Sequence, residues 1–310
     1  MKALKRYKIW KRYKNGNYTT IINILNGTKI RETEDDEFIP DFAENIDVLT
    51  STVCENECPW CYAGCTMNGK HGDLLKWKFL DTLHPYTELA LNLNFPMPPD
   101  FEQLLHKLKD KKIIANVTVA QNHFEKHHDL IKSWIDKKLI YGVGVSLSHT
   151  TPEFVKLIQQ FPTAVIHTIN GVTSPVNFER LRGFADLNAK LKILILGYKD
   201  VGRGISWKDG SGGRIRAYQD WTYRNLDKMR DWFSVLSFDN LALEQLNVRR
   251  LLTEKQWEEF YMGDDGGFTF FLDLVDGTFG KNSLATKRYP IMDSVDDMFK
   301  FIRNEEDNDD

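Results

Sequence analysis

Cysteine is scarce and unevenly placed in this chain of 310 residues: there are four cysteines, all lie between residues 54 and 65, and none follows. No apolar run approaches the roughly 20 residues of a membrane span, and the basic N-terminus lacks the apolar segment and cleavage site of a secretory signal. A net charge of −3 provides no overall positive charge for binding nucleic acid. We therefore expect a cytoplasmic protein without a membrane segment, because clustered free thiols persist in reducing compartments.

Three of the four cysteines are spaced Cys54-x3-Cys58-x2-Cys61, directly after the apolar run Ile46 to Leu49. Thiolates so close in sequence can reach one metal centre, and sulfur ligands select zinc or iron–sulfur clusters. Structural zinc sites usually combine two separated ligand pairs, and no second pair follows here. A ferredoxin-type cluster takes four cysteines in a C-x2-C-x2-C-x3-C-P run, which Cys65 does not complete. Three cysteines would leave one iron of a four-iron cluster open to a small molecule.

This motif resembles the signature of the radical S-adenosylmethionine (radical SAM) superfamily, C-x3-C-x2-C with an aromatic residue before the last cysteine. The resemblance implies that Cys54, Cys58 and Cys61 ligate a 4Fe-4S cluster. Trp60 would then shield the cluster, and Cys65 would not be a ligand. The resemblance also implies that S-adenosylmethionine binds the open iron and is cleaved to methionine and a 5′-deoxyadenosyl radical. An external flavodoxin- or ferredoxin-like protein would supply the electron.

From Ile46 onward, short apolar runs alternate with helix-like segments. Such alternation predicts an α/β fold with a parallel sheet and crossover helices. Periodicity alone does not distinguish an open doubly wound sheet from a curled barrel, but six units that begin with a cysteine loop resemble the partial (β/α)6 barrel of the superfamily. The expected strands are 46–49, 88–93, 113–119, 140–147, 163–169 and 191–196, and the expected helices are 74–83, 101–109, 124–137, 152–160 and 175–188.

We divide the chain into four parts. Residues 1–44 are an N-terminal β lead-in with a hairpin at Asn15-Gly16, and residues 45–200 are the radical SAM partial barrel. Residues 201–303 are a C-terminal α+β extension on the substrate side, and residues 304–310 are an acidic, disordered tail. Within the extension we expect a glycine-rich basic flap at 201–216, helices at 220–233, 253–261 and 293–303, a strand at 238–246, and a hairpin at Asp276-Gly277.

Active sites of parallel α/β folds gather at the carboxyl ends of the strands. The superfamily usually carries Gly-Gly-Glu-Pro after its second strand, whereas this chain has Asn-Leu-Asn-Phe-Pro at 92–96 and keeps only the proline. The resemblance assigns S-adenosylmethionine contacts to Asn94 and Pro96 at this position. By position alone it assigns further contacts to the ends of later strands, at Ser146, Ser148, Asn170, Gly197 and Tyr198.

Basic residues after the sixth strand, Lys199, Arg203 and Arg214, favour an anionic substrate such as a nucleotide, a nucleic-acid base or an acidic small metabolite. His71, in a turn with two glycines, is a further candidate for substrate contact. Residues 70–289 also resemble uncharacterised radical SAM proteins of bacteriophages. This resemblance does not indicate a substrate. Two alternatives stay open: a non-catalytic iron–sulfur or zinc-binding scaffold that keeps the barrel, and a peptide-modifying radical SAM enzyme.

Overall fold

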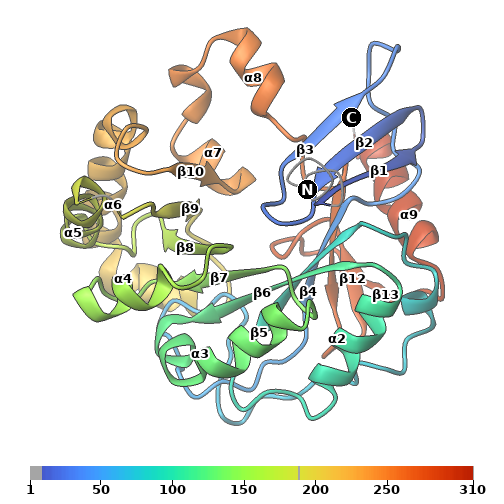
Figure 1. The fold of residues 1–310 in the computed structure, drawn as a ribbon, viewed down its shortest axis with the longest axis horizontal. Coiled ribbons are helices and arrows are strands. Elements are labelled where there is room, and N and C mark those ends of the chain that lie inside the picture. Colours follow the sequence, from blue (N-terminus) through green and yellow to red (C-terminus); the bar gives the residue numbers. More distant parts are fainter. Residues whose placement is uncertain (1–8, 188, 310) are drawn as a thin grey trace, which may run out of the picture.

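The structure, a computed structural model, describes residues 9–187 and 189–309 (Figure 1). Most described strands form one sheet of ten strands in the order β10-β9-β8-β7-β6-β5-β4-β11-β12-β13. Neighbours from β10 to β11 in this order are parallel, and β12 and β13 continue the sheet with antiparallel pairs. The strands are β4 (Asn45–Leu49), β5 (Glu88–Leu93), β6 (Ile114–Ala120), β7 (Gly142–Ser146), β8 (Ala164–Ile169), β9 (Lys192–Leu196), β10 (Val235–Phe238), β11 (Thr269–Asp273), β12 (Thr278–Gly280) and β13 (Tyr289–Pro290).

Helices connect the parallel strands and cover the outer, convex face of the sheet (Figure 1). Parallel neighbours require such crossovers because both strands start at the same edge. The described strands curl around the opposite face without closing, since β10 and β13 each have one neighbour. The predicted partial barrel is therefore confirmed. The crossover helices are α2 (Phe101–Asp110), α3 (Gln121–Asp136), α4 (Pro152–Ile158), α5 (Pro175–Asp186) and α6 (Arg203–Met229).

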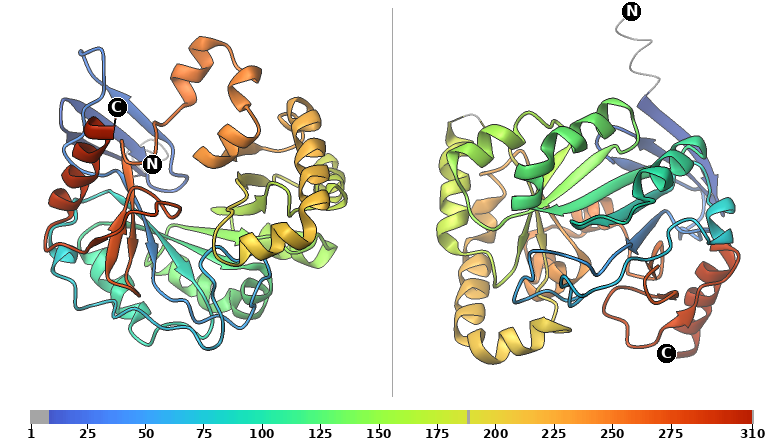
Figure 2. Two further views of the ribbon diagram at one scale, coloured as in Figure 1. Left: turned by 180° about the vertical axis from the view of Figure 1, so that it is seen from behind. Right: turned by 90° about the horizontal axis from the view of Figure 1, so that it is seen from below.

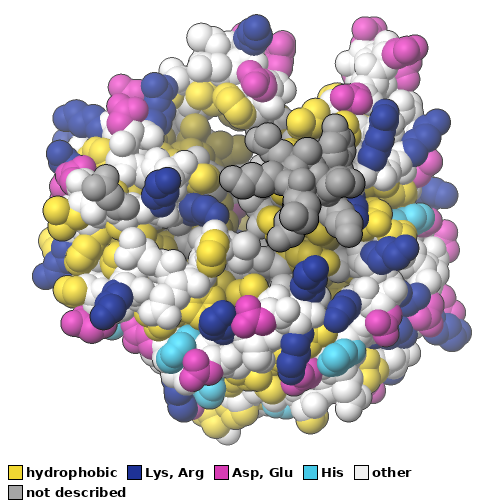
Figure 3. All heavy atoms as spheres, in the orientation of Figure 1, with side chains coloured by type: hydrophobic (Ala, Val, Ile, Leu, Met, Phe, Trp, Pro, Cys, Tyr) yellow, Lys and Arg dark blue, Asp and Glu magenta, His cyan; other side chains and the backbone are white. Residues whose placement is uncertain are grey.

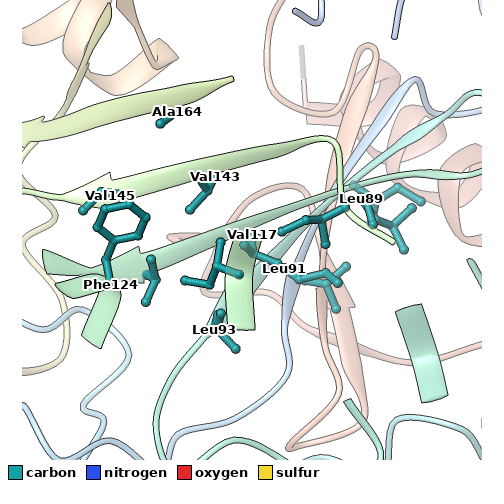
Figure 4. Close-up of a cluster of buried hydrophobic side chains, with 14 of the residues drawn as sticks. Leu89, Leu91, Leu93, Val117, Phe124, Val143, Val145 and Ala164 are labelled. Atoms are coloured by element: carbon teal, nitrogen blue, oxygen red, sulfur yellow. The ribbon is translucent and has the colours of Figure 1, made fainter. Parts of the chain in front are cut away.

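The core lies between the sheet and these helices. Alternate residues of β5, namely Leu89, Leu91 and Leu93, point to the helix side and are buried. Figure 4 shows them beside valines of β6 and β7 and near Phe124 of α3. Burying one such leucine contributes about 1.5–3 kcal/mol. The intervening residues of β5 and their register partners in β6 and β7 face the inside of the curl. Several of them are small or polar, such as Ala90, Asn92, Thr118 and Gly144.

The N-terminal part forms a separate antiparallel sheet of β1 (Trp10–Asn15), β2 (Tyr18–Asn23) and β3 (Lys29–Glu32). The predicted hairpin at Asn15-Gly16 is confirmed, and part of the predicted first strand lies outside the described residues. A second turn at Asn26-Gly27 adds β3, which the sequence analysis did not predict. Glu44 ties this sheet to the barrel because it pairs with Arg31 at 2.9 Å and with Lys29 at 3.6 Å.

The predicted flap at 201–216 is wrong, because residues 203–216 form the first half of the 27-residue helix α6. Interior glycines cost about 1 kcal/mol each in a helix, so the local sequence disfavours this structure. Gly210 and Gly213 lie on an open side of the helix, whereas Ile215, Leu226 and Met229 are buried against the rest of the protein. Tertiary packing therefore overrides the local preference.

Other parts of the extension differ from the prediction in smaller ways. The expected strand at 238–246 is instead the end of β10 followed by α7 (Asn240–Gln245), because Asp239 caps that helix by accepting from Ala242 N. The last helix, α9 (Val295–Asp309), includes most of the predicted tail. The predicted helix at 74–83 is reduced to the short 3-10 helix η1 (Lys78–Asp81). A second 3-10 helix, η2 (Val248–Leu251), lies between α7 and α8.

The predicted helix at 253–261 and the predicted hairpin at Asp276-Gly277 are confirmed as α8 (Glu254–Phe260) and the β11–β12 pair. β10 to β13 belong to the same sheet as β4 to β9, and Figure 2 shows this shared sheet from two further sides. The division into four domains stays a prediction. None of the described helices has the length and apolarity required to cross a membrane.

Candidate active site at the cysteine loop

Residues 51–71, the cysteine loop, leave the carboxyl end of β4 and return to it, carrying all four cysteines. The two ends of the loop are joined by hydrogen bonds: Thr52 N donates to Lys70 O at 2.9 Å, and Nδ1 of His71 lies 2.9 Å from Ser51 Oγ. His71, a predicted substrate residue, therefore contacts the stem of the loop. Hydrogen bonds between its own two ends therefore close the loop.

Two asparagines at the end of β5 attach the cysteine loop to the sheet. Asn92 Oδ1 accepts from Thr50 N at 2.5 Å and from Thr50 Oγ1 at 2.9 Å, and Asn92 Nδ2 donates to Ser51 O at 2.9 Å. Asn94 Nδ2 donates to Ser51 O at 3.0 Å and lies 3.6 Å from Cys65 Sγ. Within the described residues Asn94 Oδ1 accepts no hydrogen bond, so this oxygen is the atom of Asn94 that could accept from a ligand.

The four thiols differ in how easily they ionise. A hydrogen bond from Cys65 lowers the pKa of Cys61 and raises that of Cys65 itself. Burial raises the pKa of Cys54 and Cys58. Among the described residues no three histidine, cysteine, aspartate or glutamate side chains already surround one metal position. The donor set still fits an iron–sulfur cluster, because three thiols on one loop can turn toward a common centre.

The start of α6 also contacts the cysteine loop, and Figure 2 shows the two segments next to each other. Arg203, a predicted substrate residue, donates from Nε to Cys58 O at 3.0 Å and from Nη2 to Cys65 O at 2.8 Å. Trp60, the aromatic residue of the motif, packs edge-on against Trp207 of α6 with ring centroids 5.4 Å apart. Two side chains of α6 therefore position the loop.

The first turns of α3 also flank the loop. Phe95, which precedes the exposed Pro96, stacks on His127 with centroids 3.8 Å apart and accepts at its backbone oxygen from Glu55 N at 3.1 Å. His123 is buried, and its Nε2 lies 3.3 Å from Glu55 Oε1 without the alignment of a hydrogen bond. Burial lowers the pKa of His123 and outweighs the opposite effect of Glu55. A neutral imidazole therefore lies beside the cysteine motif at pH 7.

Lys199, a further predicted substrate residue, crosses the inside of the curled sheet. Its Nζ donates to Ser283 Oγ at 2.6 Å and lies 4.2 Å from the ring centre of Tyr62 in the cysteine loop. Burial raises the pKa of Asp47 on β4, and Lys199 opposes this shift. The side chain of Asp47 is nevertheless exposed. Asp47 alternates with the buried Ile46 and Val48, so its carboxylate lies on the inner face of the sheet, the side on which Lys199 links Tyr62 of the cysteine loop to Ser283.

Neutral polar groups of β7 and β8 also lie on the inner face of the sheet. A Cβ on Gly144 would lie 2.2 Å from Cε1 of His167, so a larger residue would force this ring to move. Burial lowers the pKa of His167 to about 4, which keeps the ring neutral at pH 7. Its Nδ1 has no hydrogen-bond partner in the described structure. Ser146, a predicted cofactor contact, is the register partner of His167 and completes a polar pair.

The C-terminal extension covers the predicted contacts at the ends of β8 and β9. Gln245 Oε1 accepts from Tyr198 N at 2.9 Å and from Asn170 Nδ2 at 3.1 Å, and Gln245 Nε2 donates to Tyr198 O at 2.9 Å. Asp239 accepts from Gly197 N at 2.8 Å. The backbone donors predicted to face a cofactor are therefore already paired. The only sequence signal for this role of α7 is that polar residues such as Gln245 interrupt the otherwise apolar stretch 238–246.

Two further predicted residues are exposed to solvent. Ser148 is exposed, and its backbone N donates to Gln121 Oε1 at 2.9 Å. Arg214 is exposed on α6, where its guanidinium lies 4.7 Å from the ring centre of Trp207. The predicted cations Lys199, Arg203 and Arg214 therefore do not converge on one anion site.

A cavity of about 610 Å³ opens between α7, α8 and residues 281–284. Figure 3 shows the molecular surface hollowed beside α8. The wall of the cavity contains the stacked rings of Trp257 and Tyr261, whose centroids are 4.5 Å apart. The charged residues of the wall are three acids and two bases, and the base Arg249 is already paired with Glu254 at 2.7 Å. The lining charges are Glu244, Asp264, Asp265, Arg249 and Lys281.

Comparisons with known proteins agree with this architecture. No protein-family model and no curated protein sequence matches the chain. The crystal structure of Streptococcus suis SuiB bound to S-adenosylmethionine matches with a TM-score of 0.57 at 12% identity, over 94% of this chain and 87% of that chain. The chain has the fold of SuiB. SuiB bound to the precursor peptide SuiA matches with a TM-score of 0.56 at 13% identity and the same coverage. A further SuiB structure matches at 0.52 and 12%, over 88% of this chain and 81% of that chain.

Proposed function

We propose that the protein is a radical SAM enzyme. The observation that carries this proposal is the position of the C-x3-C-x2-C motif, on a loop held at the carboxyl end of β4 in a partial barrel. Sheets of this kind build their active sites at this edge. The proposal is supported by the fold of SuiB, a protein crystallised with S-adenosylmethionine. The resemblance to bacteriophage proteins rests on the sequence alone and stays a prediction.

In this proposal Cys54, Cys58 and Cys61 hold a 4Fe-4S cluster, and Trp60 shields it. A cluster of this type supplies the electron that cleaves S-adenosylmethionine to methionine and a 5′-deoxyadenosyl radical. Asn94 Oδ1, which accepts no hydrogen bond from the described residues, would accept from the amino group of the cofactor. Asp239 and Gln245 of the C-terminal part already cover the ends of β8 and β9, and this cover would limit the access of water and solvent reductants to a carbon radical.

A peptide is the substrate class that we favour over a nucleotide or an acidic metabolite. An anionic substrate needs converging cations, whereas Arg203 already donates to two backbone carbonyls and Lys199 to Ser283. The cavity between α7 and α8 offers aromatic rings, three carboxylates and two basic side chains, which suits a neutral or basic peptide segment. The structure of SuiB with a precursor peptide supports this choice.

The enzymatic proposal is tested by anaerobic reconstitution with iron and sulfide, followed by incubation with S-adenosylmethionine and dithionite. We expect about one four-iron cluster per chain and the release of 5′-deoxyadenosine, measured by mass spectrometry. A variant with Ala at positions 54, 58 and 61 is the control and should yield neither. A clustered protein that makes no 5′-deoxyadenosine would instead be an iron–sulfur scaffold, and tightly bound zinc after anaerobic purification would also exclude the enzyme.

The substrate class is tested by adding separate pools of peptides, nucleotides and acidic metabolites to the active protein. A true substrate raises the rate of 5′-deoxyadenosine formation above the uncoupled rate, because it consumes the radical productively. We expect this stimulation from the peptide pool, with a new mass in one peptide. Stimulation by nucleotides alone would refute the peptide proposal and restore the anionic substrate.

A further inference from the structure

The most extensive contact of the cysteine loop with a distant part of the chain is made by one residue of α6. Arg203 N donates to Cys61 O at 3.1 Å. The guanidinium of Arg203 donates to Cys58 O at 3.0 Å and to Cys65 O at 2.8 Å. One residue therefore fixes the backbone at the last three cysteines, across sequence separations of 145 and 138 residues.

The contact requires an unusually close approach of two backbones. Gly202 has φ +57°, and a Cβ at this position would lie 2.2 Å from Tyr62 O. Only glycine adopts this conformation without a side chain that would push the loop away. The start of α6 is itself held, because Tyr198 Oη donates to Gly204 O at 2.5 Å. The structure around Arg203 therefore leaves little freedom for the loop or the helix to separate.

The same contact brings positive charge to the cysteines. Arg203 stands at the first position of α6, where the aligned peptide dipoles of a long helix produce partial positive charge. No acidic residue lies in the first turn of the helix, and the nearby Asp200 is paired with Lys208. Carbonyl oxygens accept hydrogen bonds from the guanidinium without cancelling its charge. This charge acts across the loop backbone on whatever the thiols bind.

We propose that Arg203 is a positioning residue that orders the cysteine loop before a metal binds and raises the reduction potential of the bound centre. The second part rests on the proposed function, because it requires the cluster. Ordering follows from the three hydrogen bonds. The potential follows from charge, since reduction adds an electron to the centre and a fixed cation nearby favours the reduced state.

Two variants separate geometry from charge. Arg203→Lys keeps the positive charge but cannot form the two-pronged contact with Cys58 O and Cys65 O. Arg203→Gln loses both the charge and the contact. Arg224→Gln is the matched control, because Arg224 is an exposed arginine on the same helix whose only ion pair among the described residues is with Asp220. The measurements are amide hydrogen exchange over residues 54–66 in the metal-free protein, iron and sulfide per chain, and the midpoint potential of the reconstituted centre.

We expect both Arg203 variants to speed amide exchange in the cysteine loop by at least about tenfold and to retain less iron. Only Arg203→Gln should lower the reduction equilibrium constant about tenfold, which is about 59 mV for one electron. Arg224→Gln should behave as the unchanged protein. Unchanged exchange in Arg203→Gln would overturn the ordering role, and equal potentials in Arg203→Gln and the unchanged protein would overturn the role of charge. If the unchanged protein assembles no cluster, the proposed function fails, but exchange in the metal-free protein still decides the ordering role.

Discussion

Replacing Asn92 by leucine tests whether the end of β5 holds the cysteine loop in place. Leucine has a similar size but removes three hydrogen bonds, two accepted from Thr50 and one donated to Ser51 O. Thr50 and Ser51 are fully buried. Not every group loses its partner: Thr50 Oγ1 still donates to Asn92 O at 2.8 Å, and Ser51 O still accepts from Asn94. Only Thr50 N–H is left buried without an acceptor.

The expected loss in the free energy of unfolding follows from these broken and remaining hydrogen bonds. One orphaned buried N–H costs about 1–3 kcal/mol, and each lost hydrogen bond with a remaining partner costs about 0.5–1.5 kcal/mol. Partial relaxation of the strand ends reduces the sum, so Asn92→Leu should lower the free energy of unfolding by about 2–4 kcal/mol. Faster hydrogen exchange should begin at Thr50 and continue into the cysteine loop.

The assay is urea denaturation of the metal-free protein, followed by tryptophan fluorescence, with Asn116→Leu as the control. Asn116 is the inward-facing asparagine of the next strand and makes one long hydrogen bond, of 3.4 Å, to Glu88. Its replacement should cost less than about 1 kcal/mol. Equal losses of stability in the two variants, or a loss below 1 kcal/mol in Asn92→Leu, would refute the argument that these hydrogen bonds anchor the loop.

Three further predictions concern single residues. Cys65→Ala should keep most of the iron, whereas Cys54→Ala should abolish the cluster; equal loss in both variants would mean that no iron is open to a cofactor. Asn94→Leu should weaken S-adenosylmethionine binding by about 1–3 kcal/mol, measured by calorimetry on the clustered protein, and unchanged affinity would remove Asn94 from the cofactor site. Burial alone would raise the pKa of Glu44, but Lys29 and Arg31 outweigh it and lower this pKa. The stability from Glu44 is therefore present above its unfolded pKa and lost as pH falls through the lower folded value, below about pH 4. Glu44→Gln should cost about 3–5 kcal/mol at pH 7 and flatten this acid dependence in thermal melts; a variant with the same acid dependence as the unchanged protein would contradict the role of Glu44.

The sequence by itself determined the features that a few neighbouring residues encode. The spacing of Cys54, Cys58 and Cys61 places three thiols on one short loop whatever the rest of the chain does. The apolar run at 88–93 predicted β5 (Glu88–Leu93), and the helix predicted at 253–261 is α8. Such features depend on local geometry and side-chain chemistry, so they can be read without knowing the fold.

Only the tertiary structure decided which groups are free to act. Arg203 is a basic residue in a glycine-rich stretch by sequence, yet packing of α6 makes that stretch helical and brings the guanidinium to carbonyls more than a hundred residues away. Gln245 occupies the backbone of Tyr198 for the same reason, across a separation of 47 residues. Hydrogen bonds of this kind depend on how strands and helices pack, and local propensity carries no information about the partner. A residue type therefore suggested a chemistry, and the fold determined whether its atoms were already engaged.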